Sequence, residues 1–79
     1  MRAGAQAAAQ TRAALAEPLT ERELAVLRAL RGDLSLRGIA DSLHLSVNTV
    51  KGYAKGLYRK LGVASRAEAV SRGRELGLC

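Results

Sequence analysis

The stretch SVNTVKGYAKGLYRKLG, residues 46–62, decides the fold that we expect for this chain of 79 residues. Ser46 is a natural N-cap residue, because its hydroxyl can accept a hydrogen bond from a backbone amide two or three positions later. The apolar residues that follow recur at steps of three, four and seven, as they do on one face of an α-helix; these are Val47, Val50, Leu57 and Leu61. We therefore predict a helix over about residues 47–61, which ends at Gly62.

The same helix carries a second stripe of residues, and this stripe is cationic. Lys51, Lys55 and Arg59 recur at steps of four, so they lie along one face, roughly opposite the apolar stripe. No Asp or Glu lies between residues 42 and 67. A solvated helix face usually mixes acidic with basic residues, so the absence of acids favours a polyanionic partner over an ordinary solvated surface.

Length and composition narrow the class of protein. Seventy-nine residues allow one small domain, and 13 Lys and Arg against 7 Asp and Glu leave a net charge of +6. Such a charge favours a nucleic-acid partner, with an anionic membrane surface as the next choice. The absence of Trp and Phe, with only two Tyr, leaves few rings for stacking on single-stranded bases.

The sequence lacks the residues that disulfide frameworks, metal sites, catalytic sites and membrane spans require. One Cys and one His provide neither a disulfide framework nor a Cys/His metal site. No nucleophile–base pair and no glycine-rich phosphate loop can be recognised, so we expect no enzyme and no cofactor. No apolar run reaches membrane-spanning length, and we expect no membrane partner.

Three further helices with short connections are predicted around residues 46–62. Thr20 and Glu23 have the spacing of a capping box, which opens a helix to about Arg31. Ser35 caps a short helix over residues 36–43. The segment SRAE, residues 65–68, reads as another capping box, and it opens a last helix that closes at Gly77. The inner faces of the first and last helices are expected to hold Val26, Leu27, Leu30, Ala69, Val70, Gly73 and Leu76.

The expected fold is all-α, a four-helix bundle that contains a helix-turn-helix. Ala40 is small, as required where the second and third helices cross, and Leu45 and Val50 supply the apolar positions after the turn. His44 lies at the turn position that often needs a positive φ, which His tolerates better than most residues. Residues 1–18 are expected to be a flexible tail or linker, and residues 19–79 the domain.

From Leu19 to Leu78 the chain resembles the LuxR-type (GerE-like) helix-turn-helix DNA-binding domain. The segments that carry the resemblance are LTERE (19–23), VL (26–27), IA (39–40), LSVNTVK (45–51), YRKLGV (58–63), SRAEAV (65–70) and RELGL (74–78). The chain is most similar to the C-terminal module of large ATP-binding LuxR-family regulators. The resemblance implies sequence-specific binding to double-stranded DNA, as part of a bacterial transcriptional regulator, with the third helix in the major groove.

The resemblance also implies which residues carry this function. The base-reading positions are Lys51, Gly52 and Lys55. The positions near phosphates are Asn48, Thr49 and Arg59, with Arg37 as a further candidate, and the amides from Ser46 onward present the positive end of the helix dipole to phosphate. The fourth helix is expected to form a homodimer contact through Ala67, Val70, Ser71 and Arg74. RNA polymerase is a further candidate partner, no small molecule is expected to bind, and the expected location is cytoplasmic and nucleoid-associated.

Two positions depart from the family pattern, and two glycines lie inside the third helix. The family usually has His where this chain has Tyr53, and Glu where it has Gly38. Gly52 and Gly56 lie inside the third helix, where each costs a helix about 1 kcal/mol relative to Ala. These two glycines are either neutral surface positions or points where the backbone approaches DNA closely.

Two other functions remain open at this stage. The promoter-recognition module of a sigma factor shares the Thr49-Val50-Lys51 pattern, but it usually ends soon after the recognition helix, whereas a fourth helix is predicted here. A basic protein-interaction module that does not bind DNA would show no salt dependence of binding to random duplex.

Overall fold

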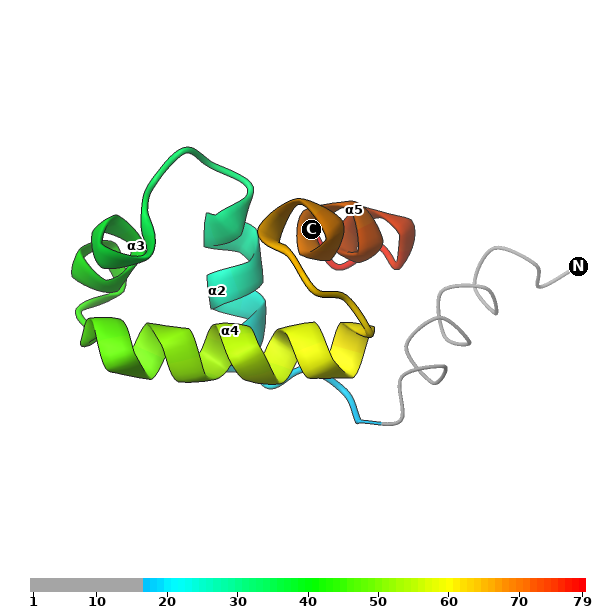
Figure 1. Cartoon of the computed structure of the whole chain (residues 1–79), viewed down its shortest axis with the longest axis horizontal. Helices are drawn as coiled ribbons and strands as arrows, with labels where there is room; N and C mark the ends of the chain where they lie inside the picture. Colours follow the sequence, from blue (N-terminus) through cyan, green and yellow to red (C-terminus); the bar gives the residue numbers. More distant parts are fainter. Residues whose placement is uncertain (1–16) are drawn as a thin grey trace, which may run out of the picture.

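The computed structural model describes residues 17–79, and within them the chain forms four helices (Figure 1). They are α2 (Glu21–Leu30), α3 (Leu36–Leu43), α4 (Val47–Leu61) and α5 (Arg66–Glu75). Within residues 17–79 no strand occurs, and the prediction of an all-α fold with four helices is confirmed. The tail or linker predicted for residues 1–18 lies outside the described residues, except for its last two.

The first three of these helices begin at the predicted capping residues. The Thr20 hydroxyl accepts from the Glu23 amide at 3.1 Å, and the Glu23 carboxylate accepts from the Thr20 amide at 2.9 Å, so this capping box is confirmed. The hydroxyls of Ser35 and Ser46 accept from the amides of Gly38 and Thr49, each at 3.1 Å. These bonds satisfy amides that have no acceptor within their own helix.

The capping box predicted at the start of α5 is only half correct. Ser65 accepts from the Glu68 amide at 3.2 Å, as expected, but the Glu68 carboxylate accepts from the amide of Ala64 rather than that of Ser65, also at 3.2 Å. The backbone at Ser65 is more extended than at the other caps, with a φ of −140°. Rotation about this N–Cα bond reorients the preceding peptide, which brings the amide one residue earlier within reach of the carboxylate.

The turn between α3 and α4 depends on one residue in the left-handed region. His44 has a φ of 59° and forms the C-cap of α3, as the sequence predicts. The amide that follows, that of Leu45, donates to the carbonyl of Ala40 at 2.8 Å and closes the end of the helix. Gly62, with a φ of 71°, ends α4 in the same conformation. The length of α4 is thus set by its N-cap at Ser46 and by this end at Gly62.

All three other helices pack against α4 or against one another around a single core. In Figure 1, α3 lies over the N-terminal end of α4 and α5 over its C-terminal half, with α2 between them. On α4 the buried stripe is formed by Val50, Ala54, Leu57 and Leu61, whereas Val47 is only half-buried. The buried apolar residues are Val26, Leu27, Leu30, Ile39, Ala40, Val50, Ala54, Leu57, Leu61 and Ala69.

Helix α5 lies close to α2, and it also holds the loop that follows α2. A Cβ atom at Gly73 would lie 2.9 Å from the sulfur of Cys79 and 3.0 Å from a methyl group of Leu27, so only glycine fits without displacement. Arg66 donates from Nε to the carbonyl of Leu30 at 3.0 Å and from Nη2 to that of Gly32 at 2.8 Å. None of the four helices is long and apolar enough to cross a lipid bilayer.

Candidate nucleic-acid interface

The cationic stripe of α4 points away from the core. Lys51, Lys55 and Arg59 are all exposed, because they lie on a different side of the helix from the buried stripe. Asn48, Thr49 and Gly52, the other α4 positions predicted to contact DNA, are exposed too. A Cβ atom at Gly52 would have nothing within 4 Å, so this position lies on open surface. Every predicted DNA contact on α4 is therefore exposed to solvent.

At the N-terminal end of α4, the two predicted hydroxyl-bearing residues contact each other. The hydroxyls of Ser46 and Thr49 are 2.8 Å apart, in addition to the cap bond from the Thr49 amide. The first amides of a helix have no acceptor within it and carry the positive end of the helix dipole. Arg37 lies exposed in the first turn of α3, which packs on α4.

The stripe is not free of acidic neighbours, and this corrects the expectation drawn from α4 alone. Arg59 Nη1 donates to Oε1 of Glu17 at 2.8 Å, in an ion pair whose side chains are 64% and 55% exposed. The hydrogen bond from Arg59 and its positive charge lower the pKa of Glu17, and the same contact raises the pKa of Arg59. One of the predicted phosphate contacts is thus occupied by a carboxylate in the free domain.

A second ion pair fixes α4 against α2, and the sequence did not point to it. Lys60 Nζ donates to Oε1 of Glu23 at 2.7 Å, with side chains that are only 10% and 8% exposed. The same carboxylate also completes the capping box with Thr20. Burial by itself raises the pKa of Glu23, but the hydrogen bonds from Lys60 and Thr20 outweigh burial, and the net pKa is lowered. Glu23 therefore joins the start of α2 to the end of α4.

Gly56 belongs to this second ion pair and not to the exposed face. A Cβ atom at Gly56 would lie 2.7 Å from Oε2 of Glu23, so the missing side chain makes room for the carboxylate. Gly56 is therefore not the neutral surface position considered from the sequence, because a side chain there would displace the carboxylate of a nearly buried ion pair. At Gly38 a Cβ atom would lie 3.2 Å from Cδ2 of Leu34, so this departure from the family pattern faces the loop before α3.

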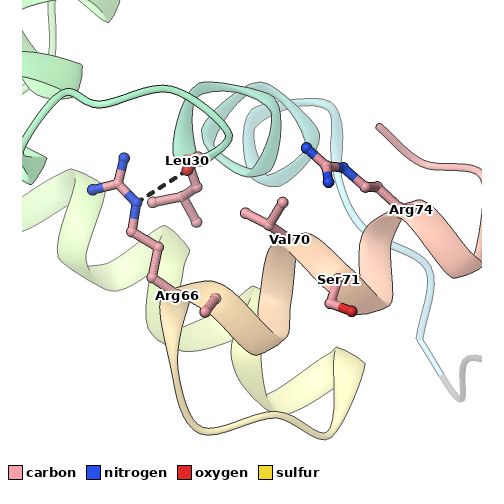
Figure 2. Close-up of a pocket in the computed structure, with 6 residues that line it drawn as sticks. Leu30, Arg66, Val70, Ser71 and Arg74 are labelled. Atoms are coloured by element: carbon pink, nitrogen blue, oxygen red, sulfur yellow. Dashed lines mark hydrogen bonds between the residues drawn. The ribbon is translucent and has the colours of Figure 1, made fainter.

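An open groove lies between α5 and the end of α2 (Figure 2), and it is lined by the residues that were predicted to form the dimer contact. The groove has a volume of about 530 Å³ and is lined by Leu30, Arg66, Ala67, Val70, Ser71 and Arg74. Figure 2 shows Val70 facing Leu30, with Arg66 on one side and Arg74 on the other. Among residues 17–79, Arg74 makes no ion pair. The structure thus brings Ala67, Val70, Ser71 and Arg74 to one surface, away from the stripe of α4.

Residues 17–72 match the model of a known family, which is described as bacterial regulatory proteins, luxR family. The chain belongs to the LuxR family. It is 42% identical over 59 residues to the HTH-type transcriptional regulator MalT of Yersinia pestis (strain Pestoides F) and to that of Yersinia pseudotuberculosis (serotype O:1b, strain IP 31758). The matched segment is 75% of this chain and 6% of each relative, so the chain spans a small part of the length of these regulators. No solved structure matches the chain.

Membership in the LuxR family identifies these helices as a DNA-binding regulatory module and not as an enzyme. The match to the luxR family extends to residue 72, through most of α5, the helix by which the sequence distinguishes this family from the sigma-factor module. In this LuxR-family domain Tyr53, which stands where the family usually has His, is half-buried, and it packs against the hydrophobic core. No group of three His, Cys, Asp or Glu residues that could hold a metal occurs in the described part of the chain.

Proposed function

We propose that this domain binds double-stranded DNA sequence-specifically, as part of a bacterial transcriptional regulator, with α4 in the major groove. The observation that carries the proposal is the pair Lys51 and Lys55, exposed on the face of α4 that lies away from the core. The major groove of B-DNA is wide enough for an α-helix, and its base edges distinguish all four base pairs. The relatives that carry a similar segment are named transcriptional regulators, which supports the same role.

Base reading is assigned to Lys51, Gly52 and Lys55. A lysine ammonium can donate to the O6 and N7 acceptors of guanine, and such contacts discriminate between bases. Gly52 has no side chain to donate from, and the space around it is open. The backbone of α4 can therefore approach the base edges at Gly52, and discrimination rests on the two lysines.

Phosphate binding is assigned to residues around this central pair. Contacts of this kind fix the position of a protein on DNA without reading its sequence, and they make affinity depend on salt. At the start of α4, the first-turn amides and the polar side chains form an anion-binding end. The residues proposed to contact phosphates are Arg37, Ser46, Asn48, Thr49 and Arg59.

We further propose that two copies of the domain associate through α5 when they bind DNA. The groove next to α5 presents Ala67, Val70, Ser71 and Arg74 together, with an apolar floor that a second copy could cover. A dimer of this kind would read two half-sites about 34–36 Å apart or a multiple of that spacing. RNA polymerase is proposed as a partner of the whole regulator, and the proposed location is cytoplasmic and nucleoid-associated.

The test begins with a selection of bound sequences from a random duplex pool, followed by titrations of the selected site and of random duplex. Lys51→Ala is expected to cost about 1–3 kcal/mol on the selected site and to relax the preference at one base pair. Arg59→Ala should weaken binding to all duplexes about equally. Arg72→Ala is the matched control, because Arg72 lies on α5 in an ion pair with Glu75; it should leave affinity for a single half-site nearly unchanged.

Two results would contradict the proposal. If Lys51→Ala and Arg59→Ala had the same effect on every sequence, the division between base reading and phosphate binding would be wrong. If the logarithm of the binding constant did not fall with the logarithm of the salt concentration, the basic face would not neutralise phosphates. The second result would favour a protein-interaction module.

A further inference from the structure

The chain enters the domain alongside the C-terminal end of α4. Two residues that precede α2, Glu17 and Pro18, contact two successive residues of α4: Arg59 donates to the Glu17 carboxylate at 2.8 Å, and Lys60 donates to the Pro18 carbonyl at 3.2 Å. Figure 1 shows this segment meeting α4 near the end of that helix. We call Glu17 and Pro18 the entry strap.

The two contacts of the entry strap differ in how firmly they are held. Lys60 is nearly buried and also bonds to Glu23, so the Pro18 end of the strap is anchored at the edge of the core. The pair between Glu17 and Arg59 is exposed to solvent on both sides. Exposed ion pairs contribute little to stability, so Glu17 can leave Arg59 without disturbing the packing of α2 on α4.

The chemistry of the exposed pair matches that of the proposed DNA contact. A guanidinium presents donors in a planar fork, which fits carboxylate and phosphate oxygens equally. In the free domain one oxygen of the Glu17 carboxylate accepts from Nη1 of this fork. A DNA phosphate that approaches Arg59 therefore meets a negative charge beside the guanidinium and competes with Glu17 for Nη1.

We propose that Glu17 is an intramolecular phosphate mimic, which occupies Arg59 in the free domain and is displaced when DNA binds. This inference rests on the proposed function, since it needs Arg59 to contact a phosphate. Attachment of residue 17 to α4 and binding of DNA at Arg59 then weaken each other, because the two anions repel and compete for the same donor. A conformational change that draws Glu17 away from α4 would raise affinity for DNA, whereas one that presses it onto Arg59 would lower affinity.

The test compares Glu17→Gln with the wild-type chain in titrations of random duplex at low salt. Removing the charge should tighten binding about two- to fivefold, the range expected for an exposed ion pair, and the gain should shrink as salt is added. Glu21→Gln is the matched control, because Glu21 is exposed on α2 four residues later and makes no ion pair within residues 17–79. It makes the same change in net charge but frees no donor proposed to contact DNA, so it should alter affinity by less than about 1.5-fold.

Two further measurements identify the route of the effect. In an Arg59→Ala background, Glu17→Gln should no longer change affinity. Without DNA, an NMR titration of the Glu17 carboxyl should give a pKa below the usual glutamate value in the wild-type chain, and Arg59→Ala should restore the usual value. Addition of duplex to the wild-type chain should raise the pKa of Glu17 as well, because Arg59 is then taken by phosphate.

The outcomes separate this inference from the proposed function. If the wild-type chain binds duplex with the expected salt dependence but Glu17→Gln binds like Glu21→Gln, the mimic is refuted and the function stands. A gain that persists in the Arg59→Ala background also refutes it, because the effect would then be a general one of charge. If the wild-type chain shows no salt-dependent binding, the proposed function fails, although the lowered pKa of Glu17 would still report the ion pair.

Discussion

Two glycines of α4 should respond in opposite directions to the same substitution. Gly52 and Gly56 lie four residues apart in the middle of one helix, and alanine is the better helix former by about 0.8–1.0 kcal/mol at either position. At Gly52 the added methyl group has nothing within 4 Å, so we expect the full gain. For a domain of this size, 1 kcal/mol corresponds to a rise in Tm of about 4–8 °C.

At Gly56 the added methyl group competes with the carboxylate of Glu23. Its Cβ would lie 2.7 Å from Oε2, so the carboxylate must move. Lys60 and the Thr20 amide donate to this same carboxylate at 2.7 and 2.9 Å. A hydrogen bond to a charged group contributes about 1.5–3 kcal/mol, and the loss of one exceeds the gain in helix propensity. We expect Gly56→Ala to be destabilised by about 0.5–2 kcal/mol, and thus to lie about 1.5–3 kcal/mol below Gly52→Ala.

The assay is chemical denaturation of both variants, followed by circular dichroism under identical conditions. A Glu23→Ala background provides the control, because it removes the carboxylate, and there the two glycine substitutions should become equal. Equal stabilities in the presence of Glu23 would refute the reasoning. That result would mean that the carboxylate swings aside freely and does not fix α4 on α2.

Two further substitutions test the packing of α2. The charge and hydrogen bonding of Lys60 hold the pKa of Glu23 below its ordinary value of 4.5 despite burial, which acts to raise it. Glu23 therefore contributes stability above about pH 4.5 that is lost as the pH falls through its lowered folded-state pKa, and Glu23→Gln should lose less stability than wild type between about pH 7 and pH 3 in urea titrations. Gly73→Ala would press a methyl group against Leu27 and Cys79 at a cost of about 1–3 kcal/mol, which the gain in helix propensity of about 0.8–1.0 kcal/mol offsets only in part, so its Tm should fall by the equivalent of up to about 2 kcal/mol. A raised Tm would show that Cys79 and Leu27 move aside.

Much of the fold follows from local patterns in the sequence. The caps at Thr20, Ser35 and Ser46 and the positive φ at His44 each depend on residues within a few positions, and all four are confirmed. The stripes of α4 follow from helical periodicity in the same way. Local chemistry therefore predicts where each helix begins and which side of it faces the core.

The rest depends on contacts between residues far apart in the chain. The exposed pair of Glu17 and Arg59 joins residues 42 positions apart, and no periodicity in either segment indicates it. The position of Gly56 next to Glu23 depends on how α4 is rotated against α2. The bond from Ala64 to Glu68 depends on one φ angle, which the residue types leave open. Spacing in the sequence predicts faces, whereas the neighbours of a given side chain depend on the packing of whole helices.

The two hydrogen bonds of Arg66 bear on how small this domain can be made. They tie the first turn of α5 to the carbonyls of Leu30 and Gly32, where the chain leaves α2 on its way to α3. A fragment that ended after α4 would return both carbonyls to water and uncover Leu27, which Gly73 now shields. A transfer of α4 and its DNA-contacting residues onto another scaffold will therefore need to include all four helices.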